Sequence, residues 1–424
     1  MSIEIIVALG LLVFVYALMT VNLVHRTVVA MLGAGLGAIA LIILGKAPTF
    51  EGLVDHISFE TLGLLMGMMI IVGIMGESGI FRRMSYHLFR LCRGSPALIF
   101  ILLILATALM SAFLDNVTTL LIVAPITIDI ARLIKISPTR FLIAEVLSSN
   151  IGGAATLIGD PPNIMVGSVF SLGFLEFIYN LAPIILIILG VNLLLWYIPE
   201  RKNLRRIKSC PIPSRYRKPV NRRIFIRSSV VLMLVIAMFF LEDLLGVSSA
   251  AIALAGATIL LLLTGIDIYD ALSNVEWPTL LFFAGLFIFV GTLEELGLIT
   301  AIGKEIINIS GGSLSLLIVL ILWVSAFASA FIDNIPYTAT MIPVVGYLST
   351  TMGYPLEPLA WALVLGACLG GNGTLVGASA NVVMAGIAER EGVKVDFLGF
   401  MKIGLPTMVV SMLLSTAYLL LRFT

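Results

Sequence analysis

The chain repeats itself at a constant offset of 218 residues. Three ungapped stretches of the first half align with the second half: 61–79 with 279–297, 111–125 with 329–343, and 147–163 with 365–381. In these stretches 21 of 51 positions are identical. Chance agreement of Leu, Ile and Val is expected in apolar segments, but an Asp-Asn pair, a Gly-Gly pair and a final Asn also coincide. We infer an internal duplication, so any fold for this chain must contain the same architecture twice.

Both halves are strongly apolar. Of the 424 residues, 60% are hydrophobic and only 12% are charged, and the net charge is +1. A soluble domain carries about 25% charged residues, and a surface that binds nucleic acid needs a surplus of Lys and Arg. We therefore exclude a soluble enzyme, a nucleic-acid-binding protein and a disordered chain. The length predicts a polytopic membrane protein with about ten crossings of roughly 20 residues each.

Hydropathy predicts an all-α fold with uninterrupted spanning helices near 3–23, 27–45, 61–79, 178–198, 229–245, 248–265, 279–297 and 404–422. Two further apolar segments in each half are interrupted by polar residues. We interpret 97–133 and 313–348 as re-entrant hairpins that enter and leave on one side of the membrane. We interpret 140–172 and 359–390 as helices that cross once and are broken in the middle.

These segments predict a first repeat at 1–199, a basic linker at 200–227 and a second repeat at 228–424. Each repeat makes five crossings, so the second is inverted relative to the first. With the linker in the cytoplasm, 22 of the 25 Lys and Arg residues lie on the cytoplasmic side of the cell membrane, as the positive-inside rule requires. Both termini are then outside. We interpret the linker as an anchor of the topology, with a site for lipid headgroups or a partner as the alternative. The acidic loop 266–277 fits this layout poorly.

The breaks and the hairpin tips are the predicted binding site. Backbone breaks at membrane depth are tolerated where they line a cavity, and matching breaks in an inverted repeat mark transport sites. A charge at that depth costs at least about 2.5–3.5 kcal/mol, so an intramembrane carboxylate indicates function. Hard cations such as Na⁺ bind carbonyl, carboxylate, amide and hydroxyl oxygens. The alternative for the tip residues is helix capping, which is compatible with ion binding.

The candidate ligands in the first half are Asp115, Asn116, Thr118, Thr119, Gly152, Gly153, Thr156, Asp160 and Asn163. Those in the second half are Asp333, Asn334, Thr338, Gly370, Gly371, Asn372, Thr374 and Asn381. We expect Asp115 and Asp333 to carry the charge of the transported ion. Asp160 has no carboxylate equivalent in the second half, and is either a proton carrier or a structural Asp-Pro turn.

Two other residues rank below these candidates. Glu145 is placed near the cytoplasmic edge of its helix. Cys368 precedes the second Gly-Gly pair, where a thiol suits arsenite. A single thiol is a poor site for trivalent arsenic, so a small buried residue is the preferred explanation. A segment at 85–93 has the pattern of a short interfacial amphipathic helix.

The motifs resemble one family of transporters. They read SAFLDNVTT at 111–119, GGAAT at 152–156, GDPPN at 159–163, GACLGGNGT at 366–374 and GASANV at 377–382. They are similar to the ion transporter superfamily, in the branch that joins arsenical pumps, NhaD-type Na⁺/H⁺ antiporters, citrate-transporter-like permeases and the melanosomal P protein. Within that branch the sequence most resembles the P protein.

The resemblance implies a homodimer and an elevator mechanism, in which hairpins and broken helices move against the other helices. It also implies that the tips and the Gly-Gly breaks hold coupling ions and substrate. Relatives that carry dicarboxylates have Ser-Asn-Thr at the tips, where this chain has Asp115 and Asp333. That difference argues against di- and tricarboxylate substrates.

The sequence therefore predicts an ion-coupled secondary active transporter that exchanges Na⁺ or another cation for H⁺ by alternating access. We expect no enzymatic activity, no nucleic-acid partner and no cofactor other than Na⁺ or H⁺ as the coupling ion. Two different substrates are also compatible with the motifs: an organic anion of the citrate type, and arsenite or antimonite in an efflux permease that could use a soluble ATPase partner. A different class is a passive anion channel. The paired intramembrane aspartates disfavour a purely structural or sensory protein.

Overall fold

The computed structural model of the chain describes residues 2–21, 24–46, 48–80, 95–133, 136–205 and 221–424. These residues form helices joined by turns and loops, with no strand among them. Seven of the helices are long and apolar enough to cross a membrane: α1 (Ile3–Val21), α2 (Arg26–Ile43), α4 (Phe59–Glu77), α10 (Phe174–Arg205), α15 (Trp277–Glu295), α17 (Leu314–Phe331) and α21 (Phe397–Phe423). The predicted all-helical membrane fold is thereby confirmed, and its orientation in the membrane stays a prediction.

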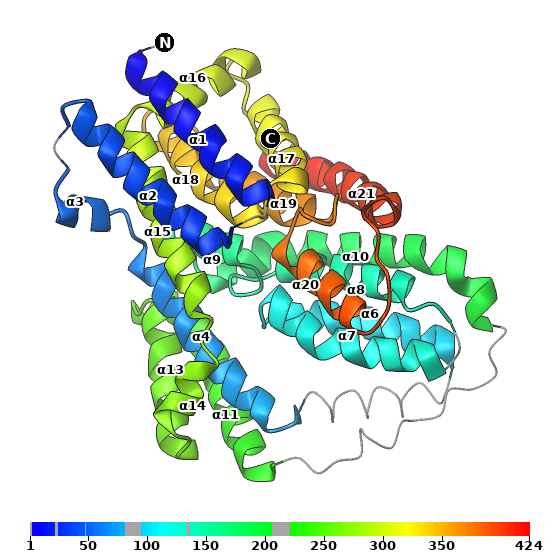
Figure 1. Cartoon of the computed structure of the whole chain (residues 1–424). Coiled ribbons are helices and arrows are strands. Elements are labelled where there is room, and N and C mark those ends of the chain that lie inside the picture. Colours follow the sequence, from blue (N-terminus) through cyan, green and yellow to red (C-terminus); the bar gives the residue numbers. More distant parts are fainter. Residues whose placement is uncertain (1, 22–23, 47, 81–94, 134–135, 206–220) are drawn as a thin grey trace.

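Six of the described helices have no break near the middle and pack on one another, and we call them the unbroken group; α10 and α21 are also continuous but pack against the hairpins and broken helices. The unbroken group consists of α1, α2, α4 and α15 together with α11 (Arg222–Phe239) and α13 (Ser249–Thr264). Helix α2 packs along α15, and α4 packs along α13 (Figure 1). Glycines permit this close approach, because a Cβ on Gly37 would lie 2.1 Å from Oγ1 of Thr292 and one on Gly67 would lie 2.6 Å from the backbone of Ala253.

The segments predicted as hairpins and broken helices form four interrupted pairs, which we call the interrupted group. The hairpins are α6 (Pro96–Ser111) with α7 (Asn116–Leu133) and α17 with α18 (Asn334–Thr350). The broken helices are α8 (Thr139–Gly153) with α9 (Pro161–Phe170) and α19 (Leu356–Gly370) with α20 (Ser379–Arg390). Helix α6 packs on α8 and α17 packs on α19, so each hairpin lies against the broken helix that follows it.

Two helices are longer than hydropathy predicts. Helix α10 continues through Pro183 and Pro199 to Arg205, and α21 begins at Phe397 because the carboxylate of Asp396 accepts the backbone N–H of Gly399 at 2.7 Å. Four short helices were not predicted: α3 (Phe50–Val54), α12 (Glu242–Leu245), α14 (Ile268–Ser273) and α16 (Leu298–Ser310). The predicted interfacial helix at 85–93 and most of the linker lie outside the described residues.

Candidate functional site

Each hairpin tip uses an aspartate to begin its second helix. Oδ1 of Asp115 accepts the backbone N–H of Thr118 at 2.9 Å, and Oδ1 of Asp333 accepts that of Ile335 at 3.1 Å. The capping role is therefore present at both tips. Capping occupies one carboxylate oxygen, and at Asp333 the other oxygen, Oδ2, lies 3.6 Å from Nη1 of Arg26.

The two breaks are held open by equivalent side chains. Nδ2 of Asn163 donates to the carbonyl oxygens of Gly153 at 3.0 Å and Thr156 at 2.7 Å. Nδ2 of Asn381 donates to those of Gly371 at 2.8 Å and Thr374 at 2.9 Å. The threonine hydroxyls bind back to the hairpins, Thr156 to the carbonyl of Ala112 and Thr374 to that of Ala330. These contacts recur at the 218-residue offset that relates the two halves in sequence.

The breaks of the two halves meet each other. Nδ2 of Asn150 on α8 donates to Oδ1 of Asn372 at 2.9 Å and to Oδ1 of Asn381 at 3.0 Å. In the equivalent contact, Sγ of Cys368 on α19 donates to Oδ1 of Asn163 at 3.2 Å. Cys368 is buried, as expected of a small residue at this position, and it is also hydrogen-bonded to the first break. We call the buried polar residues at the tips and breaks the polar centre: Asn116, Thr119, Asn150, Asp160, Asn163, Asn334, Cys368, Asn372 and Asn381.

Asp160 also joins the two halves, because its Oδ2 accepts Nδ2 of Asn334 at 3.2 Å. Several buried polar atoms of this centre have no hydrogen-bond partner: Oγ1 of Thr119, Oδ1 of Asn150 and Nδ2 of Asn372. Buried polar groups are nearly always paired in proteins. Unpaired groups clustered at two helix breaks are typical of a site that binds a small polar ligand or ion.

Glycines bring oxygen atoms together at the first break. A Cβ on Gly153 would lie 2.5 Å from Oδ1 of Asn116 and 2.8 Å from the carbonyl oxygen of Gly159. A Cβ on Gly159 would lie 2.4 Å from the carbonyl oxygen of Gly153 and 2.8 Å from that of Ser111. Only glycine leaves room for these amide and carbonyl oxygens beside the break, and such oxygens are the ligands that hard cations prefer.

The remaining predicted residues have mainly structural contacts. Gly152 and Gly370 pack on the backbone of α6 and α17, where a Cβ would lie 2.2 Å from the carbonyl oxygen of Ala108 and 2.6 Å from the Cα of Ala326. The hydroxyl of Thr338 donates to the carbonyl of Asn334 at 2.7 Å, and Thr118 contributes its backbone N–H to the tip. In the described part of the chain, no three His, Cys, Asp or Glu side chains converge to hold a metal ion.

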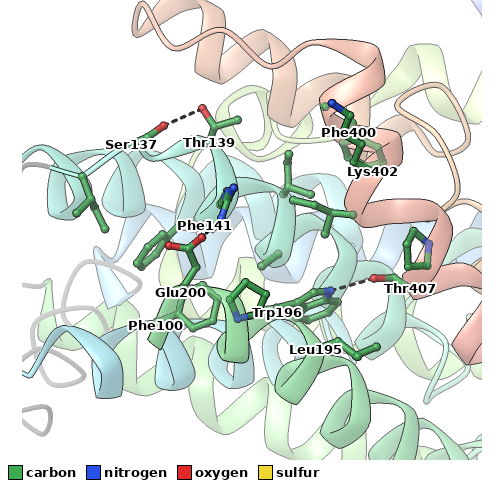
Figure 2. A pocket seen from close by; sticks show the side chains of 18 of the residues that line it. Phe100, Ser137, Thr139, Phe141, Leu195, Trp196, Glu200, Phe400, Lys402 and Thr407 are labelled. Carbon is green, nitrogen blue, oxygen red and sulfur yellow. Dashed lines mark hydrogen bonds and ion pairs between the residues drawn. The ribbon is translucent and has the colours of Figure 1, made fainter. Parts of the chain in front are cut away.

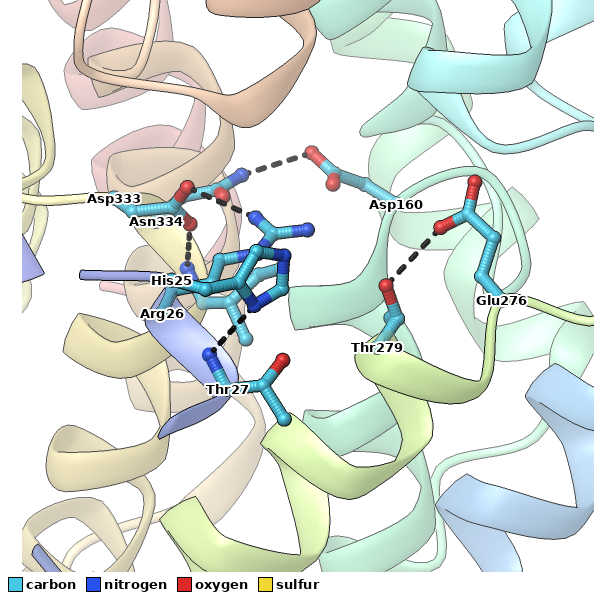
Figure 3. A network of polar contacts seen from close by, with 9 residues as sticks. His25, Arg26, Thr27, Asp160, Glu276, Thr279, Asp333 and Asn334 are labelled. Atoms are coloured by element: carbon cyan, nitrogen blue, oxygen red, sulfur yellow. Dashed lines mark hydrogen bonds and ion pairs between the residues drawn. The ribbon is translucent and has the colours of Figure 1, made fainter. Parts of the chain in front are cut away.

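A cavity of about 450 Å³ lies between the unbroken group and the interrupted group. Its walls come from the end of α1, the starts of α2, α15 and α20, and residues of both hairpins. Figure 3 shows the guanidinium of Arg26 directed at Asp333, and Glu276 beside Thr279. The hydroxyl of Thr279 donates a hydrogen bond to Oε2 of Glu276 at 3.0 Å. Of the predicted ligands, Asp333 lines this cavity, and the neighbouring Asn334 connects it to Asp160 through a hydrogen bond.

Arg26 and Glu276 were not predicted as site residues. Arg26 was interpreted only as a topology charge, and Glu276 belongs to the acidic loop that fitted the topology poorly. Burial, and then the neighbouring carboxylate of Asp115, raise the pKa of Glu276, whereas the Thr279 hydrogen bond and Arg26 oppose that shift. The sequence signal for both residues was a charge at the start of an apolar helix: Arg26 is the first residue of α2, and Glu276 directly precedes α15.

A second cavity, of about 850 Å³, lies where the ends of α6, α8, α10 and α21 meet (Figure 2). None of the predicted site residues lines it. Its polar side chains include two pairs, Arg140 with Glu200 and Trp196 with Thr407. We therefore place the candidate site in the smaller cavity and the polar centre behind it.

Glu145 lines neither cavity. It is buried on α8, accepts a hydrogen bond from the hydroxyl of Thr127, and leaves its Oε2 without a partner. It does not contact the predicted ligands through any hydrogen bond of the described residues.

Comparison with known proteins gives consistent matches. The sequence model of a family described as citrate transporter (CitMHS) matches residues 14–366. An uncharacterized transporter of Mycobacterium tuberculosis is 40% identical over 428 residues, which cover 99% of this chain and 98% of that protein. The P protein of Homo sapiens is 37% identical over 500 residues, which cover 98% of this chain and 60% of the P protein.

Among solved structures, the YdaH transporter of Alcanivorax borkumensis matches with a TM-score of 0.67 and 14% sequence identity, over 93% of this chain and 98% of that chain. At that identity the likeness concerns the fold alone. The sequence matches confirm the predicted resemblance to the branch that includes citrate-transporter-like permeases and the P protein.

Proposed function

Because the chain belongs to the citrate transporter (CitMHS) family, we propose that it is an ion-coupled secondary active transporter that exchanges Na⁺ or another cation for H⁺. The family and the relatives named as transporters make it a multi-pass membrane transporter rather than an enzyme. The choice of a cation, and of exchange for protons, is our proposal.

The sign of the charge around the cavity carries this proposal. Among the described residues that line it, Asp333 and Glu276 are carboxylates and Arg26 is the one permanent cation. Asp115 lies close enough to Glu276 for their charges to repel, and Asp160 is bonded directly behind Asp333 through Asn334. Carboxylates therefore outnumber the guanidinium, and the field of such a cavity attracts cations and opposes a multiply charged anion.

The proposed binding sequence follows the geometry. A cation that enters the cavity is attracted by Asp115 and Asp333 at the tips and is held by oxygens at the breaks, such as Oδ1 of Asn116 and the carbonyl of Gly153. Asp160, buried between the two tips, takes up the proton that is exchanged. The matched contacts of the two halves support alternating access, because a symmetric pair of half-sites offers two equivalent end states.

The larger-scale features of the proposal rest on the resemblance and the charge pattern. We propose that the interrupted group moves against the unbroken group as an elevator, and that the protein is a homodimer. We propose further that the linker is cytoplasmic, that both termini lie outside, and that membrane lipid is the only other partner needed.

One observation favours a second candidate, an organic anion transporter of the citrate type. Helix α20 begins at the cavity with Ser379 and has no side-chain cap, since its N-cap residue is Ala378. Free N–H groups at a helix start bind anions, and Arg26 lies in the same cavity. A carboxylate substrate would then need cations bound first to offset the tip aspartates.

Arsenite efflux and passive anion conduction find less support. Cys368 donates its thiol to Asn163 and is the one free thiol among the described residues, and a single thiol disfavours arsenite. A passive anion channel does not require paired carboxylates.

The test uses purified protein in sealed liposomes that contain a pH dye. After a proton gradient is imposed, Na⁺, Li⁺ or K⁺ is added outside, and the wild type is compared with Asp115→Asn and Asp333→Asn. The proposal predicts that at least one cation collapses the gradient and that both variants respond weakly or not at all. If no cation acts on the wild type but citrate is taken up, the organic anion candidate replaces it.

A further inference from the structure

Arg26 connects the two groups of helices at the second hairpin tip. It is the first residue of α2 in the unbroken group, and its Nη1 lies 3.6 Å from Oδ2 of Asp333 in the interrupted group. Its guanidinium also lies over the ring of Phe282 on α15, 5.4 Å from the ring centre. A guanidinium stacked on an aromatic ring is held in one orientation, so α15 fixes the direction in which Arg26 points.

The carboxylate of Asp333 is divided between two roles. Oδ1 caps α18 through the N–H of Ile335, and Oδ2, the oxygen that capping leaves open, faces Arg26. The side chains of Arg26 and Asp333 are 29% and 24% exposed. The pair is therefore in contact with the cavity, and a cation that enters it meets the same oxygen that Arg26 uses.

The first tip has no such partner. Helix α13, which corresponds to α2 in the second half, begins Ser249-Ala250-Ala251 without a basic residue. Glu276 instead lies near enough to Asp115 for that negative charge to raise its pKa, and the described residues contain no ion pair of Asp115. Two tips that are equivalent in sequence thus have opposite electrostatic surroundings, one beside a guanidinium and one beside a carboxylate.

We propose that Arg26 is a tethered counter-cation that competes with the transported cation for Asp333. The proposal rests on the proposed cation exchange and assigns a coupling role to a residue outside the repeated motifs. While Arg26 is on Asp333, only the Asp115 tip is open to an external cation. Since Arg26 and Asp333 belong to different helix groups, movement of one group against the other separates them, and the carboxylate then requires a cation or a proton from solution.

The charged and titratable groups that face this pair are few. Glu276 on α15 lies near enough to Arg26 for their charges to attract. His25, which also lines the cavity, has its Nδ1 turned to the backbone N–H of Thr27 at 3.4 Å. Asp160, whose Oδ2 accepts Nδ2 of Asn334, adds a second carboxylate behind Asp333. Arg26 is the one permanent cation among the described residues that line the cavity, so it is the group that competes with the transported cation.

The experiment compares Arg26→Gln with the wild type in the liposome exchange assay and determines the KM for Na⁺. Removal of the competing cation is expected to lower the KM about fivefold, a change typical of a partly exposed ion pair. Arg26→Lys keeps the charge and should lie between the two. In an Asp333→Asn background, Arg26→Gln should leave the residual Na⁺ response unchanged. Arg140→Gln, which breaks the ion pair at the other cavity, is the matched control and should not alter the KM.

A purely structural role for Arg26 would lower the maximal rate and leave the KM unchanged or raised, and that result overturns the proposal. A wild type that responds to no cation contradicts the proposed function instead. The Arg26–Asp333 interaction is then tested in cation-free buffer, by comparing the melting temperatures of the wild type, Arg26→Gln, Asp333→Asn and the double variant. Shifts that are not additive support an Arg26–Asp333 interaction, and additive shifts overturn it.

Discussion

The two halves offer a matched pair of substitutions, Gly153→Ala and Gly371→Ala. These glycines are equivalent in the repeat but differ in the space around them. At Gly153 an added Cβ would lie 2.5 Å from Oδ1 of Asn116 and 2.8 Å from the carbonyl oxygen of Gly159, which is 0.9 Å and 0.6 Å short of the 3.4 Å at which ordinary contact begins. At Gly371 the closest atoms are the carbonyl oxygen of Gly377 at 3.0 Å and the Cβ of Ala378 at 3.1 Å, which is 0.4 Å and 0.3 Å short.

The two substitutions should therefore differ in their effect on the free energy of unfolding. Replacing Gly by Ala in a helix stabilises the helix by about 0.5–1 kcal/mol, and this gain applies equally to both positions. Overpacking of a filled interior costs typically about 1–3 kcal/mol, and it applies mainly to Gly153, where a backbone oxygen must move. We expect Gly371→Ala to be within about 1 kcal/mol of the wild type and Gly153→Ala to be less stable than Gly371→Ala by about 1–2 kcal/mol.

The assay has two readouts on detergent-purified protein. Melting temperatures rank the stability of the three proteins, and the rise in melting temperature with added Na⁺ measures cation binding. Gly153→Ala displaces Oδ1 of Asn116 and should also lose most of the Na⁺ effect, whereas Gly371→Ala should keep more of it. Equal melting temperatures and equal Na⁺ effects for the two variants would refute both the packing argument and the assignment of the first break to cation binding.

Three further predictions concern single residues. Burial and Asp115 raise the pKa of Glu276, so Glu276 becomes neutral at a higher pH than a free glutamate. The KM for the cation should therefore rise as the pH falls through the pKa of Glu276. In Glu276→Gln the KM should depend less on pH. Asn163→Ala and Asn381→Ala each remove two hydrogen bonds to carbonyl oxygens of a break. Each should lower the free energy of unfolding by about 1–3 kcal/mol. Their melting temperatures should therefore be lower than that of the exposed control Asn308→Ala. Asp160→Asn keeps the shape of the side chain beside Asn334 and should reduce Na⁺-driven proton flux more than Na⁺ self-exchange; equal losses in the two liposome assays would contradict its role as the proton carrier.

The helices and breaks were predictable because they follow from local sequence. Hydropathy and the repeat place the hairpin tips at Asp115 and Asp333 and the breaks at the Gly-Gly pairs, where the structure has them. Hydropathy placed the end of this helix near residue 198, whereas α10 continues through Pro199 to Arg205. Proline inside a membrane helix is tolerated when neighbouring helices satisfy the freed backbone groups.

Residues that depend on packing between distant helices were not predictable in the same way. Asn150 corresponds to Cys368, so a comparison of the halves that looks for identical residues passes over both, although they make equivalent contacts. Arg26 approaches Asp333 only because α2 lies on α15 beside the second hairpin. The repeat identifies residues that the two halves have in common, whereas Arg26 and Glu276 occupy positions at which the two halves differ.

The most direct test of cation exchange is counterflow in liposomes. Vesicles that hold wild-type protein are loaded with unlabelled Na⁺ and diluted into a trace of radioactive Na⁺, with labelled citrate in citrate-loaded vesicles as the parallel measurement. Our account predicts a transient accumulation of labelled Na⁺ above equilibrium that is absent in Asp115→Asn, and no such overshoot for citrate. Equilibration of Na⁺ without an overshoot, or an overshoot for citrate alone, would contradict it.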